Sequence, residues 1–155
     1  MLFGKKKETK KPDLLVKENI LLNCKSSEKK QVILQMGSLL VNGGYVSESY
    51  PDAMLEREKT FSTYMGNGIA IPHGVDSAKD EVIYSGLGVM IFPEGTDWDG
   101  EQAKIVIGIA GKGEEHLEIL GNVALKLGEE EAVEALLSMN VDEIYEFLTR
   151  KDDVE

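Results

Sequence analysis

The most constraining stretch of the chain is the run from Lys104 to Gly111, which reads Lys-Ile-Val-Ile-Gly-Ile-Ala-Gly. Seven consecutive apolar or small residues, rich in β-branched side chains, are typical of a strand that is covered on both faces. We therefore place residues 104–111 in the centre of a sheet. A sheet buried on both faces requires helices above and below it, and this indicates an α/β layered fold.

Other segments supply the partners of this strand. Residues 69–71 and 82–92 are strand-like, and the glycines in the second run favour close approach of a neighbour. We expect a turn at Pro93-Glu94-Gly95 and another at Trp98-Asp99-Gly100. Ser26 or Ser27 can cap a helix whose apolar residues follow at helical spacing, and Pro51 suits the first turn of a second helix. A helix from about Glu114 to Leu127 should bury the stripe Leu117, Leu120, Ala124 and Leu127, while Asn140 and Glu143 match a capping box.

The chain has 155 residues, enough for one domain with an adequate core. We expect a basic tail at residues 1–13, one domain at 14–150 and a short tail at 151–155. No run reaches the roughly 20 apolar residues of a membrane span, and the lysine-rich start lacks an apolar signal segment. We expect a cytoplasmic protein without membrane insertion. The single cysteine, Cys24, excludes an internal disulfide and a cysteine-based metal cluster.

The net charge of −11 is unevenly distributed. Five lysines and one glutamate in residues 1–12 leave a net −15 on the rest of the chain. Nucleic-acid binding needs a basic face for the phosphates. We therefore expect no nucleic-acid partner.

Two histidines stand where strands or helices end. His73 follows Ile69-Ala70-Ile71-Pro72, and His116 follows the central strand at the start of the next helix. Sites in α/β sheets gather at such ends, and a helix N-terminus favours a neutral imidazole. We expect an exposed, mostly neutral ring at His73, as a nucleophilic nitrogen requires. Taken singly, each histidine also fits a surface residue in a turn or helix.

Arg57 closes the second predicted helix. A cation there is favoured by the helix dipole without any further role. Alternatively, its guanidinium is aimed at phosphate oxygens, which it binds with two parallel hydrogen bonds. A third hypothesis makes the two histidines part of a metal-binding or structural module, although neither a nearby cysteine nor a metal-binding spacing accompanies them.

Jointly these motifs resemble the mannitol/fructose-type enzyme IIA of the bacterial phosphoenolpyruvate-dependent sugar phosphotransferase system. The resemblance runs from about Glu18 to Leu148, and some segments favour its mannitol branch. The segments that carry it are Glu56-Arg57-Glu58-Lys59, residues 66–74, residues 106–110, Glu115-His116-Leu117, residues 42–46, residues 53–58 and residues 92–95.

The resemblance implies a phosphotransferase with a mixed, largely parallel sheet flanked by helices. It implies that His73 accepts a phosphoryl group from phospho-HPr and passes it to a cysteine of a mannitol-type IIB domain. It assigns His116 to stabilising that group and Arg57 to contacting it, with no cofactor and no metal. Since no IIB-like cysteine loop is present, IIB and the membrane permease IIC are expected on separate chains. A fructose-type or nitrogen-regulatory paralogue, acting by phosphorylation-dependent binding, is the alternative.

Overall fold

The computed structural model describes residues 11–150. Residues 1–10 of the predicted tail at 1–13, and the whole predicted tail at 151–155, lie outside this range. Two short 3₁₀ helices accompany the regular elements, η1 at Lys17–Asn19 and η2 at Asp76–Glu81. The strands are β1 Ile20–Leu21, β2 Tyr64–Gly66, β3 Ile69–Ala70, β4 Gly86–Trp98 and β5 Glu101–Ala110. The helices are α1 Lys29–Asn42, α2 Tyr50–Thr60, α3 Glu115–Lys126, α4 Glu130–Leu137 and α5 Val141–Thr149.

The five strands form one mixed sheet in the order β1-β4-β5-β3-β2. β1 pairs with β4 and β3 with β5 in parallel, whereas β4–β5 and β2–β3 are antiparallel. The predicted single α/β domain with a mixed sheet between helices is confirmed, and parallel pairing accounts for two of the four ladders. β5 has a neighbour on each side, as its apolar sequence predicted.

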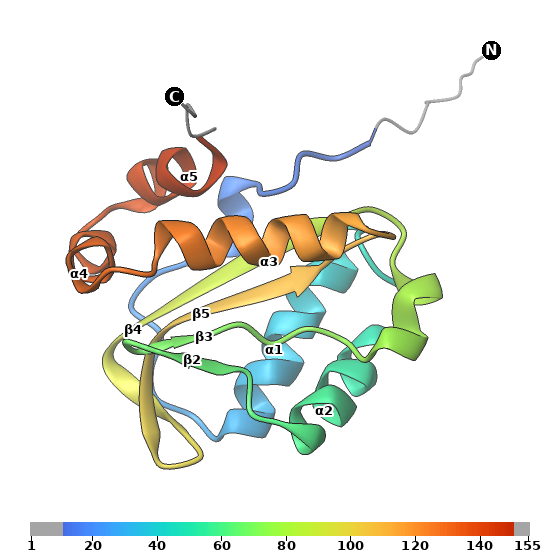
Figure 1. Cartoon of the computed structure of the whole chain (residues 1–155), viewed down its shortest axis with the longest axis horizontal. Helices are drawn as coiled ribbons and strands as arrows, with labels where there is room; N and C mark the ends of the chain where they lie inside the picture. The colour runs from blue at the N-terminus through green and yellow to red at the C-terminus, as the bar shows by residue number, and fades with distance from the viewer. Residues whose placement is uncertain (1–10, 151–155) are drawn as a thin grey trace.

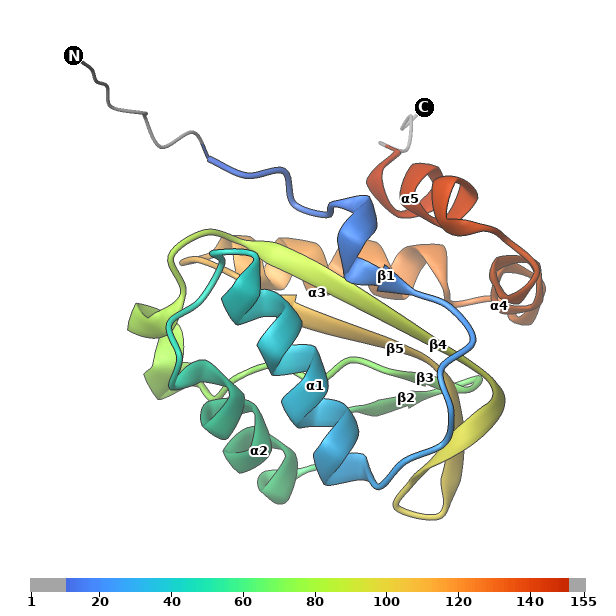
Figure 2. The same cartoon turned by 180° about the vertical axis from the view of Figure 1, so that it is seen from behind.

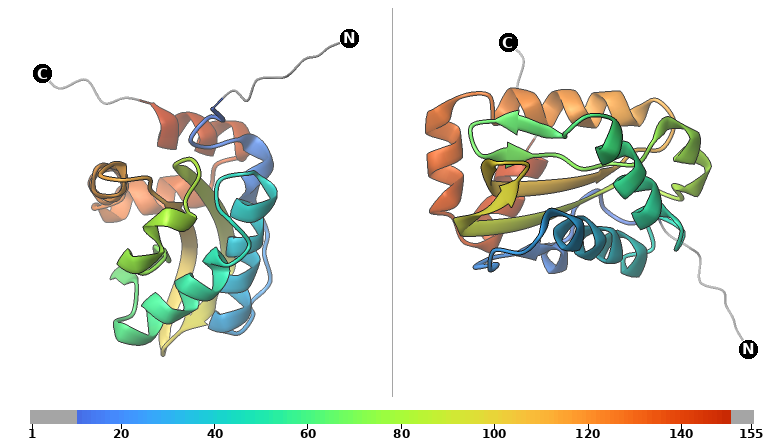
Figure 3. Two further views of the ribbon diagram at one scale, coloured as in Figure 1. Left: turned by 90° about the vertical axis from the view of Figure 1, so that its right-hand side faces the viewer. Right: turned by 90° about the horizontal axis from the view of Figure 1, so that it is seen from below.

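Helices cover both faces of the sheet, α1 and α2 on one and α3 to α5 on the other (Figures 1 and 2). The alternation along β5 explains these two layers. Its residues Ile105, Ile107 and Ile109 belong to the core under α3, α4 and α5. Val106 and Ala110 belong to the core under α1 and α2. The layers are visible edge-on in Figure 3.

Helix α1 lies very close to the β4–β5 pair. Gly88 and Gly108 face each other across the ladder, and a Cβ on either would come within 2.7 Å of the Met36 side chain. Small residues in these strands therefore admit the helix, as the strand pattern indicated. The sulfur of Met36 fills the space that two side chains would otherwise occupy.

The predicted turn at residues 93–95 is wrong. β4 continues to Trp98, and its register against β5 shifts between Ile91 and Thr96. Gly95, at φ 82°, lies in this irregular segment, so Pro93 and Gly95 mark a bulge rather than a chain reversal. The reversal comes at Asp99 and Gly100, both with positive φ, where the second turn was predicted. Buried Trp98 ends the strand and donates its indole N–H to Glu58.

Two helix details also differ from prediction. Helix α1 begins at Lys29 with Glu28 as its N-cap residue, and no side chain caps it. Ser26 and Ser27 lie before this position, where both are hydrogen-bonded to Thr96. On α3 the buried residues are Ile119 and Val123, with Leu127 just beyond its end, whereas Leu117 is 71% exposed. Ala124 is exposed as well. The predicted stripe is therefore wrong at Leu117 and Ala124, whereas Leu127 is buried and Leu120 packs partly against the core as predicted.

The C-terminal capping box is confirmed. Asn140 accepts from the Glu143 N–H, and the Glu143 carboxylate accepts from the Asn140 N–H. Within residues 11–150, no helix combines the length and the apolar character that crossing a bilayer requires.

Candidate functional site

His73 lies directly beyond β3, alongside the end of β5. Pro72 has no N–H to donate, but its carbonyl accepts from the Ile109 N–H at 3.0 Å. An isolated parallel bridge then joins His73 to Ile109. The segment therefore continues along β5 after the regular strand ends, which holds the His73 backbone against the central strand.

One nitrogen of the His73 ring is hydrogen-bonded to the backbone. Nδ1 lies 2.9 Å from the Ile71 carbonyl oxygen. Because a carbonyl oxygen only accepts, Nδ1 carries the proton in the neutral ring, and Nε2 carries the lone pair. This arrangement leaves Nε2 as the nucleophilic nitrogen.

The expected exposure of His73 is wrong: the residue is only 8% exposed. Burial is the main cause that lowers its pKa below the ordinary histidine value. The Ile71 hydrogen bond opposes this shift and the Arg57 charge adds to it, while Glu58 and Asp76 raise the pKa. The ring is therefore neutral at neutral pH, as predicted, but burial rather than exposure is the reason.

His116 lies next to His73 in the first turn of α3. The two ring centroids are 5.1 Å apart, and the ring planes are inclined at 49°. The preceding loop is tight, because a Cβ on Gly111 would lie 2.3 Å from the His116 Cα and 2.8 Å from its N. Gly111 thus lets the chain turn from β5 into α3 at the distance that brings the two imidazoles together.

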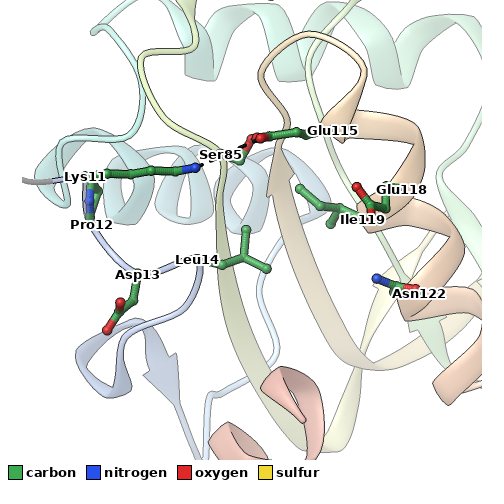
Figure 4. Close-up of a pocket in the computed structure, with 9 residues that line it drawn as sticks. All are labelled: Lys11, Pro12, Asp13, Leu14, Ser85, Glu115, Glu118, Ile119 and Asn122. Carbon is green, nitrogen blue, oxygen red and sulfur yellow. Dashed lines mark hydrogen bonds and ion pairs between the residues drawn. The ribbon is translucent and has the colours of Figure 1, made fainter. Parts of the chain in front are cut away.

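A buried hydroxyl secures this connection. Ser85 accepts the Lys112 N–H at 2.8 Å and donates to the Glu115 carboxylate (Figure 4). Glu115 also lines a pocket of about 460 Å³ with residues from the N-terminal segment and α3, namely Lys11, Pro12, Asp13, Leu14, Ser85, Glu118, Ile119 and Asn122. Neither histidine lines this pocket, so it lies beside the His116 turn and outside the histidine pair.

Arg57 lies in the last turn of α2. Its Nη1 donates to the Phe61 carbonyl at 2.9 Å, which holds the guanidinium at the helix end. Its charge lowers the His73 pKa, so it acts on the ring electrostatically. The structure therefore brings His73 and His116 together and places Arg57 near enough to His73 for its charge to act on that ring.

Sequence reasoning could not identify two residues that shape this region. The Ile71 carbonyl sets the His73 tautomer, and a backbone carbonyl has no sequence signature. Tyr50 contacts the His73 segment through the Gly74 N–H, but its sequence position resembles that of any core aromatic in a helix. In the described part of the chain, no group of three or more His, Cys, Asp or Glu side chains is arranged to hold a metal ion.

What the site can do chemically follows from its groups. A neutral imidazole with one fixed N–H and one lone pair can form a covalent bond to an electrophile such as phosphorus. A second imidazole and a guanidinium close to it can stabilise the charge of a bound phosphoryl group. The site suits transient covalent transfer of an anionic group.

Known proteins resemble this chain in sequence and in fold. Residues 13–151 match the family described as "Phosphoenolpyruvate-dependent sugar phosphotransferase system, EIIA 2". The mannitol-specific phosphotransferase enzyme IIA component of Bacillus subtilis strain 168 is 50% identical over 131 residues, which are 84% of this chain and 92% of that protein.

Two solved structures resemble the chain. IIA mannitol from Escherichia coli is 40% identical, with a TM-score of 0.78, covering 85% of this chain and 96% of that one. A complex of Escherichia coli enzyme IIAMtl with phosphorylated enzyme IIBMtl contains a chain that is 39% identical, with a TM-score of 0.79, covering 86% and 96%. The chain therefore belongs to the EIIA 2 family of the phosphoenolpyruvate-dependent sugar phosphotransferase system.

Proposed function

We propose that this protein carries a phosphoryl group from phospho-HPr to the cysteine of a mannitol-type IIB domain, through a phosphohistidine at His73. The observation that carries the proposal is the His73 ring, whose Nδ1 is tied to the Ile71 carbonyl while the His116 ring lies 5.1 Å away. Relatives named for mannitol, 50% identical in Bacillus subtilis and 40% in the Escherichia coli structure, support this sugar.

In the first step the Nε2 lone pair attacks phosphorus. A P–N bond forms at His73, and the P–N bond to HPr breaks, with its electron pair returning to the HPr ring. In the second step a IIB thiolate attacks the phosphorus, a P–S bond forms, and the electron pair of the broken P–N bond returns to Nε2. The proton stays on Nδ1 throughout, hydrogen-bonded to the Ile71 carbonyl oxygen, so the ring needs no reorientation between the two steps.

Arg57 and His116 stabilise the group while it is held. A phosphoryl group adds about −1.5 to −2 charges to a chain whose net charge is already −11. A guanidinium about 4 Å from it contributes roughly 4 kcal/mol at an effective dielectric near 20, before desolvation is subtracted. Carboxylates beyond the screening length of about 8 Å at physiological salt contribute much less. The local cation therefore outweighs the distant acidic surface.

The acceptor thiol belongs to another chain. Cys24 is half-buried with its sulfur directed to the Leu21 carbonyl, and burial raises the pKa of its thiol. These properties suit an inert structural thiol rather than a phosphoryl acceptor. We accordingly place IIB and the membrane permease IIC on separate chains, and we place this phosphocarrier in the cytoplasm with its donor.

The domain limits are part of the proposal. We assign the carrier to residues 14–150, with tails at 1–13 and 151–155. The Tyr45 hydroxyl donates to the Asp13 carbonyl at 2.6 Å, which supports a start of the packed domain near this residue.

Reconstitution tests this function. The protein is incubated with phosphoenolpyruvate, enzyme I and HPr, and mannitol-type, fructose-type and control IIB proteins are then added. We expect labelling of this protein by HPr and discharge to the mannitol-type IIB. Labelling without discharge to any sugar IIB would favour the nitrogen-regulatory alternative, discharge only to the fructose type would change the sugar, and absence of labelling would refute the proposal.

A further inference from the structure

Tyr50 connects the two chain segments that carry the histidines. It is the first residue of α2 and only 3% exposed. Its hydroxyl oxygen accepts the Gly74 N–H at 2.9 Å and donates to the Ile109 carbonyl at 3.1 Å. Gly74 follows His73 directly, and Ile109 lies just before the turn that leads from β5 to His116.

The Tyr50 hydroxyl is bonded to two backbone groups at the end of the strand ladder. The parallel pairing of β3 with β5 runs through Ile69–Ile105 and Ala70–Val106, and it ends with the bridge between His73 and Ile109. In a parallel bridge of this register the Gly74 N–H is directed at the Ile109 carbonyl. The Tyr50 oxygen is bonded to both groups, so it links the two backbones through a side chain from α2.

The Tyr50 ring is packed as closely as its hydroxyl is bonded. A Cβ on Gly74 would lie 2.7 to 3.0 Å from three atoms of this phenol. The absence of a side chain at residue 74 therefore admits the ring. Burial also raises the pKa of the phenol, which keeps it protonated and able to donate at neutral pH.

We propose that Tyr50 is a positioning residue for phosphoryl transfer, holding the His73 turn at a fixed separation from the end of β5 and hence from His116. This inference rests on the proposed function of His73. Tyr50 itself touches no reacting atom. Its effect comes from fixing where Nε2 lies relative to the second imidazole, and small displacements of reacting groups cost large factors in rate.

The test compares Tyr50→Phe with Tyr45→Phe. Tyr45 is a second buried tyrosine, 1% exposed, whose hydroxyl donates to the Asp13 carbonyl and to neither histidine segment. Each variant loses one buried phenol oxygen and keeps its ring. We expect Tyr50→Phe to accept phosphate from phospho-HPr about tenfold more slowly, and Tyr45→Phe to keep the wild-type rate.

A second measurement does not depend on phosphate. In an NMR titration of the His73 imidazole, Tyr50→Phe should raise its pKa toward the ordinary value, because a looser turn admits water to the ring. Tyr45→Phe should leave it unchanged. Gly74→Ala, whose Cβ presses on the Tyr50 ring, provides an independent perturbation and should slow transfer and shift the titration in the same direction.

The outcomes separate the two proposals. If the wild-type protein takes no phosphate, the proposed function fails and the positioning role fails with it. If the wild type is labelled while Tyr50→Phe and Tyr45→Phe match it in rate and in His73 titration, only the role of Tyr50 is overturned. Equal slowing by both variants would also overturn it, because the effect would then follow from the general loss of a buried hydroxyl.

Discussion

His73 and His116 lie 5.1 Å apart but are held in different ways. His73 is in an extended segment bonded to β5, and it is 8% exposed with its ring fixed by a backbone carbonyl. His116 is half-buried in the first turn of α3, between the tight Gly111 loop and the exposed side chain of Leu117. The fixed ring suits the nucleophile, which must keep one tautomer, and the helix-borne ring suits a group that meets the phosphate once it has arrived.

The largest expected effect is at His73, the ring assigned as the nucleophile. His73→Ala removes the only lone pair that the account assigns to the phosphorus, so labelling by phospho-HPr should fall below detection. The measurement is incorporation of labelled phosphate, with the folded state checked by circular dichroism. Retained labelling of a folded His73→Ala protein would remove this residue from the mechanism.

The position of His116 is tested through Gly111. Gly111→Ala introduces a Cβ 2.3 Å from the His116 Cα, so the start of α3 must shift. We expect transfer to slow by about tenfold to 10²-fold while His73 still takes the label. Gly121→Ala is the matched control, since it lies on the same helix and a Cβ there meets nothing within 4 Å. Wild-type rates for both variants would show that the separation of the two rings does not matter.

Arg57→Lys keeps the charge beside His73 but loses the planar fork of donors. If the guanidinium binds the phosphoryl oxygens with two hydrogen bonds, transfer should slow by about tenfold. Lys59→Ala, which removes an exposed cation from the same helix end, should have no effect. A fully active Arg57→Lys protein would contradict a bidentate contact between the guanidinium and the phosphoryl oxygens.

The smallest expected effect concerns pH. Because burial lowers the His73 pKa, the ring stays neutral below the ordinary value of about 6.5. Phosphate acceptance should therefore persist as the pH falls through this value and decline only at lower pH. In the same range the unfolded chain binds the proton more readily, so this group makes the fold less stable as the pH falls toward its lowered pKa. An imidazole titration at or above about 6.5 would contradict the burial argument.

Much of the site was predictable from sequence because strand and helix ends have strong local signals. The apolar residues of β5 predicted the central strand, and the positions of His73 and His116 at strand and helix ends predicted that the two rings lie close together. The exposure of His73 was not predictable, because it depends on α2 and α3 packing over the segment. The role of Tyr50 was not predictable for a related reason, because it comes from contacts between distant segments. The Ile71 carbonyl is close in sequence, but a backbone acceptor leaves no mark in the sequence.

The wrong predictions for the turn at residues 93–95 and for the buried stripe of α3 have a similar origin. Pro93 and Gly95 are residue types typical of turns. The pairing of β4 with β5 nevertheless continues past them, so the segment forms a bulge instead. The stripe of α3 has apolar residues at two helical phases, and only packing against β5 selects the one with Ile119 and Val123. Local propensity therefore predicted these elements, while their tertiary contacts decided the register.

Mapping the phosphate on the wild-type protein tests the central claim most directly. The protein is labelled through enzyme I and HPr, and NMR of the phosphorylated chain then identifies the modified ring nitrogen. We expect a single phosphoryl group on Nε2 of His73, with Nδ1 still hydrogen-bonded to the Ile71 carbonyl. A phosphoryl group on Nδ1, on His116 or on any other residue would contradict it.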